Sequence, residues 1–246
     1  MNSATADDRL LDNVVWHALH GPLARFAAPR RSPHFVAFEP AVNVFGAVET
    51  VDSETLARLQ DDVGPEGFCA LFRDSVGALP AGWEEHFRGM CLQMVADDLP
   101  PPSSSTPRFE RLSSADVPEM LALTELTEPG PFFERTIELG RYVGLRRDGQ
   151  LIAMAGERFR VPGFVEISAV CTHPDARGEG LGAAITLDVA RSIRAGGDEA
   201  FLHVLDSNEA AISVYRKLGF ELRRKTEVVF AQRHGSDWQP PQESGR

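Results

Sequence analysis

The sequence predicts a mixed α/β (α+β) fold in which helices flank a mostly antiparallel central sheet. Three observations support this. The turn-forming dipeptides Asp148-Gly149 and Pro162-Gly163 separate apolar segments in the manner of antiparallel hairpins. Amphipathic stretches at residues 181–193 and 208–218 have helical periodicity. A Pro/Ser-rich stretch at 100–107 predicts a linker between a smaller α/β domain (1–99) and a domain at 108–233, with a loose tail at 234–246.

Residues 1–99, the first segment, give only weak signals of secondary structure. We expect a helix at 12–20 and a second helix at 53–63, with Ser53 as its N-cap. Short strands are expected at 34–38, 41–45 and 67–72, and residues 83–95 fit either a strand or a short helix followed by a strand.

The second segment gives clearer signals. Its expected strands are 109–112, 142–146, 151–160, 164–172, 200–205, 220–223 and 228–233. Its expected helices are a helix capped by Ser114 and running to residue 123, a short one at 132–139 ended by Gly140, and those at 181–193 and 208–218, the last with Asn208 as its N-cap. Gly196-Gly197 and Gly219 end the last two helices.

Composition and charge exclude several classes of protein. The 43% hydrophobic and 25% charged residues are ordinary values for a globular protein. No apolar run could cross a bilayer, and the polar, acidic N-terminus lacks signal-peptide features, so we expect a cytoplasmic protein with no membrane partner. A net charge of −11 argues against nucleic acid. Most of this charge lies in the first half, which slightly favours a cationic acceptor. Three cysteines without a CxxC predict neither a disulfide framework nor a metal site.

A glycine-rich turn between a strand and a helix carries the strongest functional signal. The expected strand ends at Thr172, and a turn with Gly178, Gly180 and Gly182 then opens a helix. Such a turn favours an anion, because glycines let backbone N–H groups approach a phosphate and the helix N-terminus adds unpaired donors. The Walker pattern is absent. A dinucleotide GxGxxG pattern would place a glycine where Ala183 stands, and its strand would begin a βαβ unit instead of following two hairpins.

The remaining pattern is Arg/Gln-x-x-Gly-x-Gly/Ala, matched by Arg177, Gly180 and Gly182. The motif can also be aligned two residues earlier, with Asp175 in its first position and Gly178 and Gly180 as its glycines. This alignment predicts the same anion-binding turn but leaves the role of Arg177 open. Further along, residues 208–220 match Asn-x-x-Ala-x-x-(hydrophobic)-Tyr-x-x-x-Gly-Phe. With both motifs in this order, residues 109–230 resemble the GNAT superfamily of acetyl-CoA-dependent N-acetyltransferases.

The resemblance implies acetyl-CoA as acyl donor and assigns roles residue by residue. The backbone of Val170 and Thr172 would hold the pantetheine arm, and Asn208 would touch it. Tyr215 would lie near the thioester sulfur. The diphosphate would lie against the turn amides, and the whole predicted donor-binding set is Val170, Cys171, Thr172, Arg177, Gly178, Glu179, Gly180, Leu181, Gly182, Ala183 and Asn208. The first 100 residues would be an extension, and a degenerate second copy of the same fold is one interpretation of them.

The chemistry of acyl transfer to an amine requires further groups. A lysine-like amine has a pKa near 10.4, so a base or a desolvating pocket must supply its neutral form. We predict Tyr215 as the general acid for the leaving thiolate, with a plain core aromatic as the alternative. We predict Glu166 as the base, acting through water, because strand alternation places it on one face with Val170, roughly 13 Å away. Glu157 is the second choice, and His203 is expected to be a satisfied core histidine.

The sequence thus predicts an N-acetyltransferase that moves acetyl to a primary amine by direct attack in a ternary complex. The acceptor is either a small-molecule amine or a protein or peptide amine. A longer acyl donor is a weaker alternative. The competing interpretation is an acyl-CoA sensor or scaffold without transferase activity.

Overall fold

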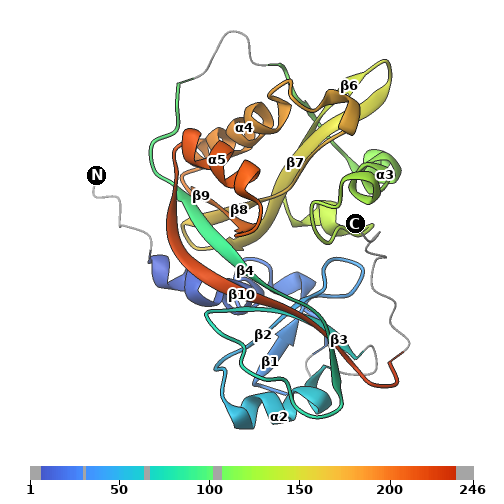
Figure 1. Ribbon diagram of the computed structural model, residues 1–246, viewed down its shortest axis with the longest axis vertical. Helices are drawn as coiled ribbons and strands as arrows, with labels where there is room; N and C mark the ends of the chain where they lie inside the picture. Colours follow the sequence, from blue (N-terminus) through green and yellow to red (C-terminus); the bar gives the residue numbers. More distant parts are fainter. Residues whose placement is uncertain (1–6, 30–31, 64–66, 102–106, 237–246) are drawn as a thin grey trace.

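The strands of the computed structural model join in one sheet that runs through the whole molecule (Figure 1). The structure describes residues 7–29, 32–63, 67–101 and 107–236. Within these ranges, ten strands lie in the order β1-β2-β3-β10-β4-β9-β8-β7-β6-β5. Neighbours pair antiparallel except β2 with β3 and β8 with β9, which are parallel. The prediction of a mixed, mostly antiparallel sheet flanked by helices is confirmed.

The first 100 residues supply four strands and most of one end of the sheet. Their elements are η1 (Asp8–Asn13), α1 (Val14–Leu19), η2 (Ala24–Phe26), β1 (Phe35–Ala37), β2 (Phe45–Val48), α2 (Ser53–Asp62), β3 (Phe68–Arg73) and β4 (Trp83–Ala96). The remaining elements are β5 (Glu110–Arg111), η3 (Ser114–Asp116), α3 (Val117–Thr127), η4 (Thr136–Leu139), β6 (Tyr142–Arg147), β7 (Gln150–Val161), β8 (Phe164–Thr172), η5 (Pro174–Ala176), α4 (Leu181–Ala195), β9 (Glu199–Leu205), α5 (Glu209–Lys217) and β10 (Phe220–Arg233).

Strand β4 occupies a middle position in the sheet although it precedes the Pro/Ser-rich stretch. It pairs with β9 along one edge and with the whole length of β10 along the other. The two predicted segments therefore share one sheet. Most of the predicted linker, residues 102–106, lies outside the described residues, as does most of the predicted tail. The division into two domains stays a prediction.

Several local expectations were wrong for identifiable reasons. Residues 41–44 form a turn closed by hydrogen bonds from Val42 and Asn43 to the Glu39 carbonyl, so the strand begins only at Phe45. Asp52, not Ser53, caps α2, because its carboxylate accepts a hydrogen bond from the Thr55 N–H. Only the 3-10 turn η4 forms within 132–139. The two predicted C-terminal strands are one strand, β10, which stays paired to β4 across a bulge near Leu222.

The sheet buries both faces. On one face, α4 and α5 pack against alternate residues of the central strands, such as Val165, Ile167, Leu202 and Val204. On the other face, α1 and aromatic side chains from the first segment enclose Phe159 and Phe201, while α3 covers Met154 and Cys171. None of the helices in the described part of the chain is long and apolar enough to cross a membrane.

Gly219 offers a test of the fold at the junction between α5 and β10. Its φ is +84°, and a Cβ there would lie 2.0 Å from the carbonyl oxygen of Asp98. We expect Gly219→Ala to lower the free energy of unfolding by about 2 to 4 kcal/mol, since left-handed strain and a backbone clash add. Urea unfolding measures this. The control is Gly149→Ala, which has φ +85° but nothing within 4 Å. Equal losses in the two variants would contradict the role of the Asp98 contact.

Candidate active site

A gap opens in the sheet between β8 and β9. The two strands pair in parallel at only three positions, which end with Glu166 opposite Phe201. Beyond this point β8 stays paired with β7, and β9 stays paired with β4. The edges of β8 after Glu166 and of β9 after Phe201 therefore have no register partner across the gap. A split of this kind leaves backbone donors and acceptors free for an extended ligand.

A bulge in β8 sits beside this gap. Met154 of β7 pairs with Cys171, whereas Gly156 pairs with Ser168, so β8 holds one extra residue between the two pairs. Ala169, within that stretch, has φ +51°, a left-handed conformation that an alanine rarely adopts. Such strain is retained where the surrounding structure enforces it, and it is concentrated at functional sites. The bulge leaves Ala169 and Val170 without register partners on either neighbouring strand.

The bulge also changes which side chains share a face of β8, and so it affects the predicted placement of Glu166 on the same face as Val170. Without it, the two side chains would lie on one face of β8. In the structure Val170 packs with the α4 and α5 face, whereas Glu166 faces Arg158 on the opposite side of the sheet. The prediction of a common face was wrong because one inserted residue moves every later side chain to the other face.

The gap ends at the N-terminus of α4. Gly180 caps this 15-residue helix in a left-handed conformation (φ +77°), with no side-chain cap. Gly178 is also left-handed (φ +83°), and no atom of the described residues lies within 4 Å of where a Cβ would stand on either glycine. Because the first N–H groups of a helix have no acceptor within the helix, and α4 has no side-chain cap, these groups are available to a ligand at this turn. Thr172, at the end of β8, approaches Gly182, whose Cβ position is 3.7 Å from the threonine Oγ1.

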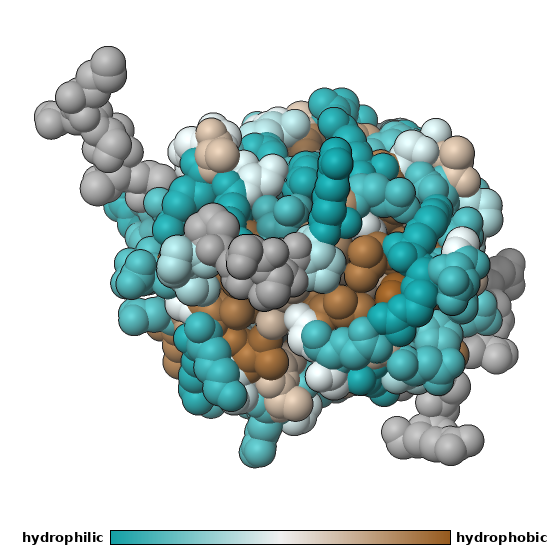
Figure 2. All heavy atoms as spheres, turned by 90° about the horizontal axis from the view of Figure 1, so that it is seen from above, coloured by the Kyte–Doolittle hydropathy of each residue, from teal (hydrophilic) through white to brown (hydrophobic). Residues whose placement is uncertain are grey.

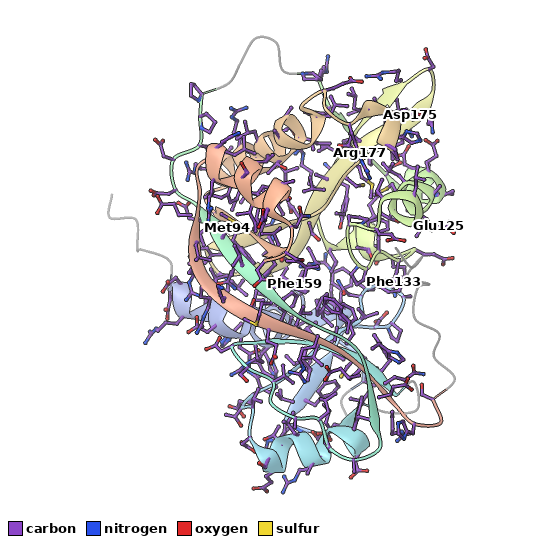
Figure 3. All side chains as sticks on the ribbon, in the orientation of Figure 1. Met94, Glu125, Phe133, Phe159, Asp175 and Arg177 are labelled. Atoms are coloured by element: carbon purple, nitrogen blue, oxygen red, sulfur yellow. The ribbon has the colours of Figure 1, made fainter. Side chains whose placement is uncertain are left out.

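The charged residues predicted in this loop point outward. Arg177 and Asp175 lie on the exposed loop between β8 and α4 (Figure 3). Glu179 forms a two-point ion pair with Arg147 of the β6–β7 hairpin, at 3.0 and 2.5 Å. That pair neutralises the carboxylate beside the open helix end. Seen from above, hydrophobic atoms reach the surface near the middle of a largely hydrophilic face (Figure 2).

Helix α5 supplies the second predicted group of residues. Asn208 caps it, and its Oδ1 accepts a hydrogen bond from the Ala211 N–H at 3.1 Å, so the N-cap interpretation is confirmed. Tyr215 is half-buried in the same cluster as Val170, with its ring 6.0 Å from that of Phe220. Burial raises the pKa of its phenol to about 12. The hydroxyl is therefore protonated at neutral pH and able to donate.

Glu166 lies at the closed end of the gap and is fully buried. Arg158 of β7 donates to both of its oxygens at 2.7 Å, and Nδ1 of His203 lies 2.6 Å from Oε1. Burial alone would raise the pKa of this carboxyl, but the charge and hydrogen bonds of Arg158 and the hydrogen bond of His203 lower it to about 2. Three aromatic rings surround the Arg158 guanidinium: Phe45, Phe72 and Phe159.

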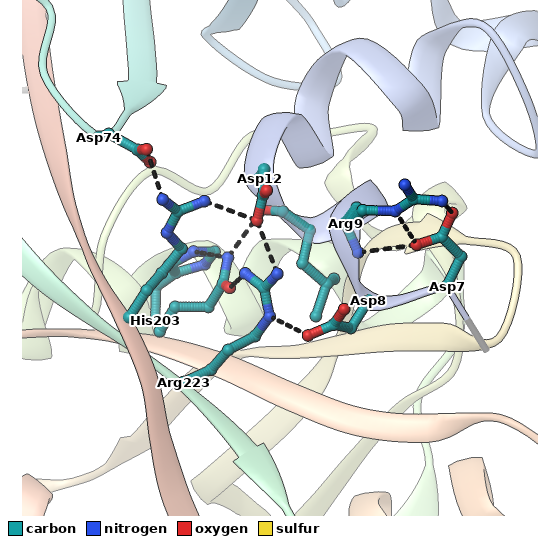
Figure 4. Close-up of polar contacts among 10 residues, drawn as sticks. Asp7, Asp8, Arg9, Asp12, Asp74, His203 and Arg223 are labelled. Carbon is teal, nitrogen blue, oxygen red and sulfur yellow. Dashed lines mark hydrogen bonds and ion pairs between the residues drawn. The ribbon is translucent and has the colours of Figure 1, made fainter. Parts of the chain in front are cut away.

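The network continues from His203 to the surface. Gln93 of β4 joins His203 at 3.1 Å, and Arg223 of β10 donates to the Gln93 oxygen at 2.8 Å. Arg223 in turn binds Asp12 at 2.6 Å and Asp8 at 3.0 Å, both in η1 (Figure 4). Because Arg223 can only donate, the Gln93 amide must present its N–H to His203. We therefore assign His203 as neutral, with its proton on Nδ1, donated to Glu166.

Sequence reasoning missed this network, except for the prediction that His203 is a satisfied core histidine, which is confirmed. The available signal was Arg158, which with Glu157 and Arg160 is one of three charged residues in a largely apolar strand, because a buried charge demands a partner. The second predicted base, Glu157, is buried and forms an ion pair with Arg160 at 3.0 Å. Cys171 is buried, and burial raises the pKa of its thiol to about 11.

Comparison with known proteins identifies the class to which this fold and site belong. Residues 142–229 match the family model described as FR47-like protein. The chain is 30% identical over 143 residues to N-alpha-acetyltransferase RimI of Mycobacterium tuberculosis, covering 87% of that protein. The chain therefore belongs to the GNAT acetyltransferase family.

Individual relatives match to different extents. A solved structure from Novosphingobium aromaticivorans, assigned to the GNAT family, is 36% identical with a TM-score of 0.81, covering 91% of this chain and 98% of that one. A GCN5-related N-acetyltransferase from Kribbella flavida shares the fold, with 18% identity and a TM-score of 0.61 over 90% of this chain and 95% of that one. The mycothiol acetyltransferase of Saccharomonospora viridis is 47% identical over 68 residues, 27% of this chain. That match spans only 22% of the relative's length.

Proposed function

We propose that this protein binds acetyl-CoA along the gap and transfers its acetyl group to a primary amine. One observation carries the proposal: the gap between β8 and β9 contains a strained bulge and ends at a helix N-terminus without a side-chain cap. An extended arm can pair with the free edge of β8 around Val170 and Thr172. A diphosphate can lie on the open N–H groups from Gly178 to Ala183.

The reaction is a direct displacement in a ternary complex. The nitrogen of the neutral amine attacks the thioester carbonyl carbon and forms a C–N bond. The tetrahedral intermediate then collapses with cleavage of the C–S bond. The nitrogen loses one proton and the departing sulfur gains one, which gives an amide and free CoA. Tyr215 supplies the proton to sulfur, because its phenol stays protonated at neutral pH.

The amine needs its neutral form, and both predicted bases are held in ion pairs. A carboxylate with a pKa of about 2, such as Glu166, holds a proton poorly at neutral pH, so it would accept one only if its contact with Arg158 opened. Desolvation offers another route, because apolar surroundings lower the pKa of an amine and favour the neutral nucleophile. We favour this second route.

The names of the relatives narrow the acceptors worth testing. An N-alpha-acetyltransferase and several mycothiol acetyltransferases are among them. We propose a primary amine, either the α-amino group of a polypeptide or the amine of a small molecule. The acidic first segment, with 15 acidic and 7 basic residues in positions 1–107, favours an acceptor that carries positive charge. A panel of peptides, amino acids and small amines distinguishes these.

Acetyl-CoA is expected to raise the melting temperature by about 5 to 10 °C at roughly 100 times its Kd. ATP and NAD serve as ligand controls. Ala183→Glu places a negative charge on the first turn of α4, where it suits the helix but repels a diphosphate, so this variant should lose the shift. Ala195→Glu is the matched control and should keep the shift, because it adds the same charge about 18 Å away, at the exposed C-terminal end of α4. An unchanged shift in Ala183→Glu would refute the proposed diphosphate site.

A second candidate function is an acyl-CoA sensor without transferase activity. The observation that favours it is that Glu166 and Glu157 are both held in ion pairs. The two functions differ in one assay, the release of free CoA thiol in the presence of an amine. Amine-dependent release by the intact protein would exclude the sensor.

A further inference from the structure

Tyr142 carries a buried hydroxyl group in the cluster that also contains Ala169 of the bulge. It is the first residue of β6, is 1% exposed, and pairs with Gly156 of β7. A Cβ at Gly156 would lie 2.2 Å from Cδ1 of the tyrosine, so the ring lies flat over this glycine. Gly156 in turn pairs with Ser168 of β8. The ring therefore lies over β7, the strand next to the one that carries the bulge.

The buried cluster that contains the ring also contains residues of the bulged segment. Tyr142 belongs to the same buried cluster as Ala169 and Cys171, the residues on its side of the bulge. Phe132 closes the opposite side, with its ring centroid 5.6 Å away in an edge-on arrangement. The ring of Tyr142 is thus fixed by packing in the cluster that contains Phe132 and Ala169 of the strained segment.

The hydroxyl has no hydrogen-bond partner in the described part of the chain. A buried hydroxyl without a partner destabilises a fold, and phenylalanine would fill the same space without that cost. Burial also raises the pKa of this phenol above its ordinary value, so it remains a donor at any physiological pH. A donor kept at a cost, beside a strained bulge, indicates a partner that arrives with a ligand.

We propose that the Tyr142 hydroxyl donates a hydrogen bond to the thioester carbonyl oxygen of the acyl donor. An acetyl group that enters through the gap reaches Ala169 and Val170 from the α4 side, where their backbone lacks register partners. Its oxygen becomes negatively charged as the amine attacks. A fixed O–H in a dry site stabilises that charge more in the transition state than in the bound ester. This inference rests on the proposed acetyl transfer and adds a second donor to the backbone N–H groups there.

The test compares two variants that each remove one unpartnered buried hydroxyl. Tyr142→Phe should lower kcat for amine-dependent CoA release by about 10- to 100-fold, with an unchanged Kd for acetyl-CoA and an unchanged or higher melting temperature. Thr226→Val is the matched control, because the Thr226 hydroxyl is also buried without a partner among the described residues but lies on β10, three strands from β8. It should leave kcat unchanged.

The outcomes separate this inference from the proposed function. Wild-type kcat in Tyr142→Phe would overturn the inference and leave acetyl transfer standing. A loss of acetyl-CoA binding equal to the loss in rate would also overturn it, because the hydroxyl would then serve ground-state binding. If the unmodified protein binds acetyl-CoA but acetylates none of the amines tested, the proposed function fails first.

Discussion

Replacing Glu166 by glutamine is expected to destabilise the fold by about 3 to 5 kcal/mol, since it leaves the buried guanidinium of Arg158 without a counter-charge. The aromatic rings around Arg158 cannot substitute for a carboxylate with two hydrogen bonds. Urea unfolding monitored by circular dichroism measures the change. Glu179→Gln is the matched control, because it removes an equally bidentate partner from an exposed arginine, Arg147. Screening by water should leave that variant as stable as the parent.

The stability difference between the parent protein and Glu166→Gln is expected to depend on pH. The pKa of Glu166 is about 2 in the folded protein against an ordinary value of 4.5, so its lowered pKa stabilises the fold fully above pH 4.5. That contribution is lost as the pH falls from 4.5 towards 2, where the folded state too takes up the proton. The difference in unfolding free energy between the parent and Glu166→Gln should therefore shrink over this window. A difference that stays constant from pH 7 to pH 3 would contradict the ion pair.

Tyr215→Phe is expected to lower kcat for CoA release by about 100-fold while leaving acetyl-CoA binding intact. The phenol is the proposed proton donor to the departing sulfur, and its pKa of about 12 keeps it protonated through the working pH range. The ring, which packs against Phe220, is preserved in the variant. Steady-state rates with a saturating amine, together with acetyl-CoA titration by calorimetry, measure the two quantities. An unchanged kcat would remove Tyr215 from the mechanism and leave it a core aromatic.

The sequence predicted the elements that depend on local chemistry. The hairpins at Asp148-Gly149 and Pro162-Gly163, the glycine loop before α4 and the Asn208 cap each follow from a few neighbouring residues. These elements were sufficient to recognise the family. The pairing of β4 with β9 was not predicted, because the two strands are more than 100 residues apart and no local pattern records that pairing.

The site was predicted less completely than the fold. The bulge depends on Ala169, a residue with no turn preference, so its left-handed conformation leaves no mark in the sequence. Consequently the side chains after it were assigned to the wrong face. The network around Glu166 draws Arg158, His203, Gln93 and Arg223 from four different strands. Its members become neighbours only after the sheet has formed.

The position of β4 has a consequence for how the molecule is made. A ribosome synthesises this strand long before either of its neighbours, so β4 must wait for β9 and β10 to emerge. Until then the backbone N–H and C=O groups along both of its edges are open to other chains. Closing the sheet requires contacts distant in sequence, which are slow to form. The last strand, β10, completes the sheet by entering between β3 and β4. The nascent protein is therefore exposed to aggregation until β9 and β10 have both been made, and its yield should depend on chaperones that cover strand edges.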